Sequence, residues 1–452
     1  MVGLGASGVS AARLLQARGA RVAVSDSRNE AEFDGDFRQW LGSAAVAAEW
    51  GGHSGEFLLR SDCIVVSPGV SLELPALVAA RRQRIPVIGE MGLACLFIDE
   101  PIVAVTGTNG KSTVVRLLGD IFTKSFGDVF VGGNIGTPVA DYVLGGDRAR
   151  LLVLEVSSFQ LDSIGFFQPQ VAVLLNISPD HLDRYPDYDA YIRSKMRVFA
   201  DQKPEQIAVV NSDDPAISAW PEKLPGRVLA FSNGRRQPPG AWLEDDTVIY
   251  ACSPEAEQPE RYPLPVALLA GPNPANAMAA IIAARQMGCP PAAIDQAMAA
   301  FQGLAHRMTP VAEIDGVLFI DDSKATNIGA VQAALQSLAR PVVLIAGGRD
   351  KRGGYGLLEE AVRQKVKAMV LIGEAREAMA AAFASTVRTE LAADMEDAVR
   401  RAMQQAAPGD IVLLSPACAS FDMFTSYTHR GEVFAEAVRR LKADSATRAT
   451  AG

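Results

Sequence analysis

One short stretch, residues 101–113, constrains the fold of this chain more than any other. It reads Pro-Ile-Val-Ala-Val-Thr-Gly-Thr-Asn-Gly-Lys-Ser-Thr. The apolar, β-branched run at 102–105 is typical of a buried parallel strand. The chain then turns through Gly107 and Gly110, and a helical pattern of apolar residues begins after Lys111. A strand, a glycine-rich turn and a helix N-terminus direct backbone N–H groups and the positive end of a helix dipole toward an anion.

The residue types in this turn predict a site for the phosphates of ATP. Lys111 can reach the outer phosphates, and the hydroxyl of Ser112 or Thr113 can hold Mg²⁺. Val105 stands where the usual phosphate loop has its first glycine, so the loop is a shortened variant. A strand–helix turn that carries lysine and threonine without binding a nucleotide is the alternative. The residues expected to contact ATP here are Gly107, Thr108, Asn109, Gly110, Lys111, Ser112 and Thr113.

Length, composition and charge limit the remaining possibilities. A chain of 452 residues favours two to four domains, each able to bury its own core. The net charge of −9 and the absence of a basic run argue against non-specific nucleic-acid binding. No apolar stretch is long enough to span a bilayer, and no signal peptide precedes the first motif. The five cysteines have no paired spacing, and we expect a cytoplasmic protein.

Residues 1–97 are predicted to form a first α/β unit. The run from Gly3 to Gly8 has the pattern G-x-G-x-x-G, and the strand at 21–26 ends in Asp26. This combination is typical of dinucleotide-binding folds, but a single such motif is a weak signal. Both NAD and a nucleotide diphosphate fit it. Only two residues precede Gly3, so the first strand looks truncated.

Residues 98–307 are predicted to form the central, ATP-binding unit. The apolar strand at 151–155 ends in Glu155, at the edge of the sheet where open α/β folds bind ligands. A carboxylate there can complete the oxygen shell of Mg²⁺. Asn134 lies in a second glycine-rich turn.

Two further candidates in this unit have ordinary structural explanations. His181 follows the strand at 171–175, where a histidine between acids is more often a loop hydrogen-bonding residue than a ligand. Lys195 lies on the predicted helix 188–200, where a lysine is usually solvated.

Residues 308–452 are predicted to form a third unit, joined through a hinge at Arg307. Strands alternate with helices, which indicates a mostly parallel sheet. Polar residues follow three of these strands, at 321–327, 347–351 and 415–422. Because the carboxyl ends of parallel strands share one edge, these groups can converge on one crevice.

The motifs together resemble the Mur ligase family over almost the full length. The family-wide motifs are at 106–113, 132–136, 154–158 and 176–185, and the motifs that resemble its glutamate-adding branch are at 322–327 and 415–420. The resemblance implies a three-domain α/β architecture: a Rossmann-like first domain, a P-loop ATPase-like central domain and a Rossmann-like third domain. It also implies an ATP-dependent ligase that joins D-glutamate to UDP-N-acetylmuramoyl-L-alanine, through an acyl phosphate, in peptidoglycan precursor synthesis. We expect these small molecules as its partners and a monomeric protein.

Site residues follow from the same resemblance. It implies catalytic roles for Lys111, Glu155, His181 and Lys195. Two Mg²⁺ ions would be held by Ser112, Glu155, His181 and Lys195, with Lys195 carbamylated. ATP would also contact Asn273, Asn276, Arg307 and Asp322, although Pro272 stands where the family usually has histidine. The UDP-muramoyl substrate would contact Ser7, Asp26, Ser27, Arg28, Gly69 and Asn134. The incoming amino acid would contact Lys324, Thr326, Lys351, Ser420, Phe421 and Tyr427.

Four alternatives are weaker or stay open. An NAD-dependent oxidoreductase leaves the ATP loop and the third unit without a role, and a P-loop switch does not explain the first unit. A ligase similar to folylpolyglutamate synthetases shares the chemistry but resembles this chain less in residues 1–97. The residues do not decide between D- and L-glutamate.

Overall fold

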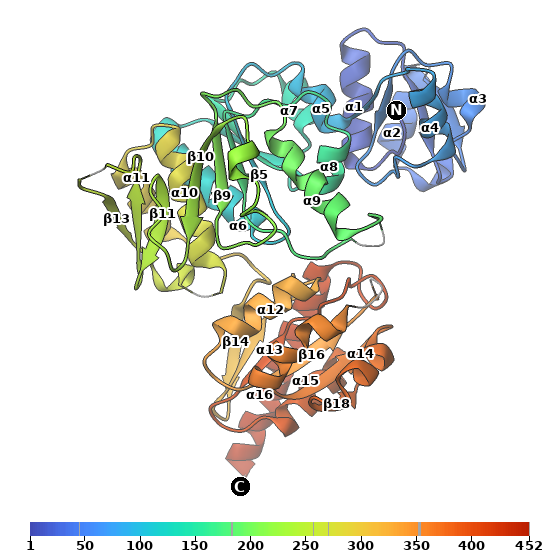
Figure 1. Cartoon of the computed structure of the whole chain (residues 1–452). Helices are drawn as coiled ribbons and strands as arrows, with labels where there is room; N and C mark the ends of the chain where they lie inside the picture. The colour runs from blue at the N-terminus through green and yellow to red at the C-terminus, as the bar shows by residue number, and fades with distance from the viewer. Residues whose placement is uncertain (45, 182–183, 256, 270, 351–353, 452) are drawn as a thin grey trace.

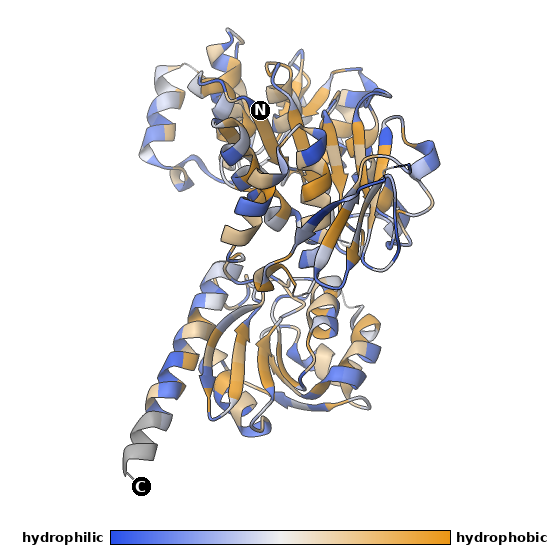
Figure 2. Ribbon diagram, turned by 90° about the vertical axis from the view of Figure 1, so that its left-hand side faces the viewer, coloured by the Kyte–Doolittle hydropathy of each residue, from blue (hydrophilic) through white to orange (hydrophobic). Residues whose placement is uncertain are grey.

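The structure is a computed structural model that describes residues 1–44, 46–181, 184–255, 257–269, 271–350 and 354–451. Figure 1 shows three α/β units in chain order, with the C-terminal unit below the other two. Hydrophobic residues concentrate in the sheets, as Figure 2 shows, and hydrophilic residues follow the loops and outer helix turns. Within the described residues, no helix combines the length and the apolar character needed to span a membrane.

The N-terminal unit is built on two short parallel strand pairs, β1–β2 and β3–β4. Val2 joins them, because it pairs in parallel with Ser25 on one side and with Val66 on the other. The predicted first strand is therefore present as this brief central pairing. The elements are α1 (Ala6–Ala17), β1 (Ala23–Asp26), α2 (Gly35–Ser43), β2 (Ala47–Trp50), α3 (Gly55–Leu58), β3 (Ile64–Val66), α4 (Pro75–Arg82), β4 (Val87–Gly89) and α5 (Glu90–Cys95).

The central unit contains a nine-stranded sheet in the order β13-β12-β11-β10-β9-β8-β5-β7-β6. The strands are β5 (Ile102–Thr106), β6 (Val129–Gly133), β7 (Leu151–Glu155), β8 (Val171–Leu174), β9 (Ile207–Asn211), β10 (Arg227–Ser232), β11 (Gly240–Glu244), β12 (Thr247–Ala251) and β13 (Glu260–Pro263). Its helices are α6 (Lys111–Phe126), α7 (Val139–Gly145), α8 (Ser158–Asp162), α9 (Tyr188–Met196), α10 (Asn273–Gln286) and α11 (Pro291–Ala300). Seven strands from β6 to β11 run parallel, and β12 and β13 continue the sheet antiparallel.

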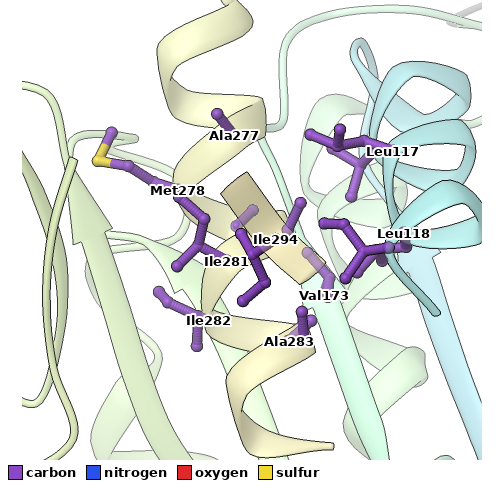
Figure 3. Close-up of a cluster of buried hydrophobic side chains, with 14 of the residues drawn as sticks. Leu117, Leu118, Val173, Ala277, Met278, Ile281, Ile282, Ala283 and Ile294 are labelled. Atoms are coloured by element: carbon purple, nitrogen blue, oxygen red, sulfur yellow. The ribbon is translucent and has the colours of Figure 1, made fainter. Parts of the chain in front are cut away.

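Helix packing explains why the parallel strands are apolar along their whole length. Figure 3 shows α10 and α6 meeting over β8, with Leu117, Val173 and Ile281 in the contact. Helix α10 is Ala-rich and almost wholly buried, which explains why its sequence is apolar on every side of the helix. The four strands β10–β13 lie in a region whose sequence carries Pro, Gly and polar residues, and the sequence did not predict them.

The C-terminal unit is a six-stranded sheet in the order β14-β15-β19-β16-β17-β18, with only β14 antiparallel. The mostly parallel sheet expected from the sequence is confirmed. The strands are β14 (Thr309–Ile314), β15 (Val317–Asp321), β16 (Val342–Gly347), β17 (Val366–Ile372), β18 (Arg388–Leu391) and β19 (Ile411–Leu414). The helices are α12 (Ile328–Ser337), α13 (Glu359–Lys365), α14 (Arg376–Phe383), α15 (Met395–Gln405) and α16 (Tyr427–Ala451).

The hydrophobic cores do not follow the three units one by one. One cluster runs continuously from Leu14 and Leu93 of the N-terminal unit to Ala140 and Leu154 of the central unit. Residues 1–97 and the central unit each also have a cluster composed of their own residues, and they share this further core because α1 and α5 pack directly on α7. The C-terminal unit has two clusters composed of its own residues. The exact boundaries at 97/98 and 307/308 stay predictions.

Candidate active site

The phosphate loop connects β5 to α6, as the sequence predicted. Gly107 has φ 149° and Gly110 has φ 88°, which favour glycine at both positions. A Cβ atom on Gly110 would overlap Oδ1 of Asn276 and lie 3.1 Å from its Cγ. Asn276 of α10 therefore lies directly against the loop. This position is compatible with the predicted contact between Asn276 and the nucleotide.

Side chains after β8 hold the loop in place. The N–H of Asn109 donates to Oδ1 of Asn176 over 2.9 Å, and Asn176 Nδ2 donates to the carbonyl of Asn109 over 3.0 Å. The hydroxyl of Thr108 shares a 3.1 Å hydrogen bond with the hydroxyl of Tyr191 and accepts from the N–H of Ser178 over 3.0 Å. These bonds fix the loop before any ligand arrives, which lowers the cost of ordering it on binding.

Two lysines from different helices converge on one carbonyl oxygen. Lys111 Nζ and Lys195 Nζ each donate to the carbonyl of Gly107 over 2.9 Å, and Lys111 also donates to the carbonyl of Thr108 over 2.8 Å. Burial lowers the pKa of Lys111, and burial together with the charge of Lys111 holds the pKa of Lys195 well below its usual range. Lys195 is only 2% exposed, so the alternative explanation of Lys195 as a solvated helix residue is wrong.

Glu155 ends β7 next to the loop, because β7 pairs with β5 in the register Val105 to Glu155. Its side chain is 2% exposed. Asn134 Nδ2 donates to Glu155 Oε1 over 2.8 Å, while Oε2 is buried without a hydrogen-bond partner. A buried carboxylate oxygen without a donor is costly, and a cation is the partner that would satisfy it.

His181 lies in the loop after β8, in a left-handed conformation with φ 55°. Its Nε2 is 3.7 Å from Oδ2 of Asp180, and its ring centroid is 4.7 Å from that of Phe159. The ring of Tyr191, which bonds to the phosphate loop, is 6.5 Å from it. The structure thus brings His181 into the neighbourhood of Lys195, whose Nζ is 4.8 Å from the Tyr191 ring centroid.

A cavity of about 640 Å³ is lined by residues of the phosphate loop and of the C-terminal unit. Both walls carry residues that the sequence analysis selected. These are Asn109, Gly110, Thr113, Asn273, Asn276, Arg307, Asp322 and Lys324. Pro272, at the position that departs from the family pattern, also lines the cavity.

Other lining residues were not predicted. They come from the ends of β9 and β10 and include Asn211, Asp213, Asp214, Phe231 and Asn233. The sequence contained a usable signal, because the apolar run of β9 ends in Asn-Ser-Asp-Asp at 211–214. Polar residues at the carboxyl end of a parallel strand face the same crevice as Glu155.

Arg307 reaches across the cleft from the linker, and Asp322 lines the cleft from the C-terminal unit. Arg307 Nη2 donates to Ser112 Oγ over 3.4 Å. Asp322 accepts from Ser415 Oγ over 2.9 Å and from the N–H of Met308 over 3.3 Å. Burial nevertheless raises the pKa of Asp322 to about 7.

The predicted amino-acid residues that the structure describes lie on two loops of the C-terminal unit and at the start of α16. Lys324 Nζ lies 3.7 Å from the ring centroid of Tyr427, and Ser420 is buried at 2% exposure. Thr326 follows Lys324 on the same loop, and its N–H donates to the Lys324 carbonyl over 2.8 Å. Phe421, at 63% exposure, is a solvent-facing side chain. Lys351 lies outside the described residues.

One buried arginine that the sequence analysis missed supports these two loops. Arg430 is fully buried, and it donates to the carbonyls of Ser323 and Cys418 over 2.8 and 3.1 Å. Its Nε also donates to Ser323 Oγ over 3.0 Å. An arginine inside an ordinary amphipathic helix gives no sequence signal of this role.

The predicted UDP-muramoyl residues of the N-terminal unit form a separate group. Asp26 accepts from the N–H of Leu4 over 2.6 Å and from Arg28 Nε over 3.0 Å. Burial raises the pKa of Asp26, but the hydrogen bonds from Arg28 and Leu4 outweigh it and hold the pKa below its usual value. Ser7 lies in the first turn of α1, and Ser27 directly follows β1, close to this pair in the chain. Gly69 accepts from Arg184 over 3.4 Å, so its loop touches the central unit.

Comparison with known proteins agrees with this geometry. Residues 1–89 match the profile of the Mur ligase MurD-like N-terminal domain, residues 105–284 the Mur ligase middle domain, and residues 306–418 the Mur ligase glutamate ligase domain. A UDP-N-acetylmuramoylalanine--D-glutamate ligase from Desulfosudis oleivorans is 46% identical over 98% of this chain and 96% of its own length.

Solved structures share the fold. A pseudomurein peptide ligase type C from Methanothermus fervidus superimposes with a TM-score of 0.63 at 18% identity, over 97% of this chain and 98% of its own. The MurF ligase of Thermotoga maritima in complex with ADP superimposes with a TM-score of 0.59 at 18% identity, over 94% of this chain and 90% of its own.

The three-unit fold and the phosphate loop facing a cleft define the class of protein as an ATP-dependent ligase. The chain belongs to the Mur ligase family.

Proposed function

We propose that this protein joins D-glutamate to the alanine carboxyl group of UDP-N-acetylmuramoyl-L-alanine, with conversion of ATP to ADP and phosphate. One observation carries the proposal: Lys111 and Lys195 meet at the Gly107 carbonyl of the phosphate loop, whose residues Asn109 and Gly110 line a cleft shared with the C-terminal unit. The 46% identical relative bears the name of this activity.

The chemistry needs a leaving group, because a carboxylate at neutral pH is a poor electrophile. When bound, ATP supplies a phosphoryl group that converts the carboxylate to an acyl phosphate, which the amine of glutamate then attacks. Phosphoryl transfer depends mainly on positioning and charge neutralisation. Lys111, the N-terminus of α6 and Arg307 supply positive charge and N–H donors around the cleft.

The residues present also fit magnesium. Glu155 Oε2 is a buried, unpartnered oxygen of the type that Mg²⁺ prefers, and Ser112 opens α6 close by. Among the described residues, no three His, Cys, Asp or Glu side chains form a metal site by themselves. The proposed donors therefore include the hydroxyl of Ser112 and a modified Lys195, together with Glu155 and His181, for two ions.

Carbamylation of Lys195 would supply a further anionic oxygen ligand for the metal ions. An uncharged amine attacks CO₂, a new N–C bond forms, and one proton is released to leave an anionic carbamate. Burial and the neighbouring Lys111 favour the uncharged amine, since both lower the pKa of Lys195. The carbamate would turn a cation beside Lys111 into an oxygen donor. A ¹³C carbamate resonance that appears with ¹³CO₂ in the wild type and is absent in Lys195→Ala would test this step.

The two outer units would hold the two substrates. The Asp26–Arg28 group and Ser7, Ser27 and Gly69 would seat the nucleotide part of the UDP-muramoyl substrate. In the C-terminal unit, Lys324, Thr326, Ser420, Phe421 and Tyr427 would surround glutamate, together with Lys351. A cytoplasmic, monomeric enzyme fits this soluble, nucleotide-linked substrate.

Phosphate release from ATP tests the proposal. We expect release only when UDP-N-acetylmuramoyl-L-alanine and glutamate are both present, with D-glutamate preferred over L-glutamate, D-aspartate and lysine. Release from ATP alone at the same rate would indicate a nucleotide-driven switch instead. Preference for lysine would contradict the proposed amino-acid pocket.

A further inference from the structure

Three side chains from distant parts of the chain meet where the C-terminal unit touches the central unit. They are Asn109 of the phosphate loop, Asp180 of the loop after β8, and Asn327, which precedes α12. Asn327 Nδ2 donates to Asp180 Oδ2 and to Asn109 Oδ1, each over 3.1 Å. Asn109 Nδ2 donates back to Asn327 Oδ1 over 3.3 Å. Asn327 is 7% exposed, so these bonds are shielded from water.

The side chain of Asn327 has two functions that can be separated. Its Oδ1 accepts from the N–H of Ala330 over 2.9 Å and so caps α12. Serine or aspartate would cap the helix equally well. The contact with Asp180 requires an N–H donor, and an aspartate at 327 would place a second negative charge beside Asp180. Among good capping residues, asparagine alone carries its acceptor and its donor on separate atoms, so that Oδ1 can cap the helix while Nδ2 reaches Asp180.

The first turn of α12 confirms that the two units approach closely here. A Cβ atom on Gly329 would overlap Oγ of Ser178 and lie 2.9 Å from its Cβ. Glycine inside a helix costs about 1 kcal/mol relative to alanine. The absence of a side chain at 329 is therefore explained by contact with the loop that precedes Asp180.

We infer that Asn327 is a positioning residue that couples closure of the C-terminal unit to the active-site loops. Asn327 holds Asp180, next to His181, and Asn109 of the phosphate loop in one arrangement only when the units are in contact. It acts through these neighbours and touches no reacting group. The structural part of this inference stands alone, and its catalytic part rests on the proposed function.

Two substitutions separate this role from simple stabilisation of the helix. Asn327→Ser keeps a capping oxygen and removes the amide that reaches Asp180. Gly329→Ala improves the helix but adds a methyl group where Ser178 leaves no room. Asp394→Ala is the matched control, because Asp394 caps α15 in the same unit by accepting from the N–H of Asp397 over 2.9 Å.

Small-angle X-ray scattering of the full-length proteins with saturating ADP tests the coupling. We expect a larger radius of gyration for Asn327→Ser and Gly329→Ala than for the wild type, and an unchanged value for Asp394→Ala. Gly329→Ala should keep or raise the melting temperature of the C-terminal unit, which a merely structural defect would lower. Superimposable profiles for all four proteins would overturn the inference.

Kinetics test the catalytic part. Loss of the cross-domain hydrogen bonds should lower kcat of Asn327→Ser about tenfold. The KM for UDP-N-acetylmuramoyl-L-alanine should change by less than about twofold, because the nucleotide part of that substrate is held by the N-terminal unit in the proposed function. Wild-type kcat in Asn327→Ser would overturn this part. If scattering changes but the wild type lacks ligase activity, the coupling stands and the proposed function falls.

Discussion

The central unit meets its two neighbours through interfaces of opposite character. Toward the N-terminal unit, α1 and α5 pack on α7 and one apolar core crosses the boundary. Toward the C-terminal unit, the contacts are polar, as in the bonds of Asn109, Asp180 and Asn327, and a cavity of about 640 Å³ remains between the walls. An apolar interface is costly to open, whereas exposed polar groups exchange readily for water. The first interface therefore holds a fixed pair, and the second can open and close around substrates.

The largest expected effect tests the fixed pair. Leu14 of α1 is 1% exposed within the shared core, so Leu14→Ala should lower the free energy of unfolding by about 3 to 4 kcal/mol. Hydrogen exchange followed by mass spectrometry should show residues 1–97 and the central sheet losing protection together. Leu335→Ala, in the core of the C-terminal unit, should affect that unit alone. Loss of protection confined to residues 1–97 in Leu14→Ala would contradict the claim that the N-terminal and central units form a fixed pair.

Substitutions in the central unit's phosphate site, beside the polar interface, should act on rate and leave stability unchanged. Lys111→Ala and Glu155→Ala should each lose about 3 kcal/mol of transition-state stabilisation in kcat/KM. The folded proteins should retain the wild-type circular dichroism spectrum. Lys124→Ala, an exposed lysine on the same helix α6, is the control and should be fully active. Near-normal turnover in either site variant would contradict the assignment.

The fixed interface should also respond to pH through one buried acid. Glu90 of α5 accepts from the N–H of Ala140 at the start of α7 over 2.7 Å, and burial raises its pKa to about 7. Because the folded protein holds this proton more tightly than the unfolded chain, stability falls as pH rises from about 4.5 through about 7. Glu90→Gln carries no such charge, so we expect it to exceed the wild type by about 2 kcal/mol at pH 8.

Thermal unfolding of both proteins between pH 5 and 8 measures this difference. The wild type and Glu90→Gln should be closest at pH 5 and diverge as pH rises. A constant difference across the range would show that Glu90 does not titrate in the interface.

The smallest predicted effect concerns the amino-acid pocket. Ser420→Ala should cost about 1.5 kcal/mol in kcat/KM for glutamate, the loss of one hydrogen bond to a charged group. The KM for ATP should stay near its wild-type value. Ser385→Ala, exposed in the same unit, is the control. An equal rise in both KM values would place Ser420 outside the pocket.

Much of the fold was predictable because the parallel strands are continuous apolar runs with polar ends. The strand at 151–155 was predicted with both observed bounds, and the helix that begins at Lys111 was predicted with its observed start. Strands β10–β13 were missed, since β12 and β13 extend the sheet as antiparallel strands in a stretch rich in turn residues. Their pairing depends on neighbours distant in sequence, which local patterns do not encode.

The candidate site also contains residues that local sequence motifs identified and residues whose roles depend on tertiary contacts. The motifs identified Lys111 and Glu155. The burial of Lys195 depends on tertiary packing, so the periodicity of its helix did not predict it. Asn327 stood inside a selected motif without an assigned role, because its partners lie 147 and 218 residues away in the chain. Cross-domain contacts of this kind become visible only when the units are placed together.

The most direct measurement follows oxygen atoms from the substrate carboxylate. The wild-type enzyme would be incubated with ATP, D-glutamate and UDP-N-acetylmuramoyl-L-alanine that carries ¹⁸O at both carboxyl oxygens. If the carboxylate is activated as an acyl phosphate in the cleft, each released phosphate contains one ¹⁸O atom and the new amide keeps the other. Product formation with unlabelled phosphate would contradict the mechanism.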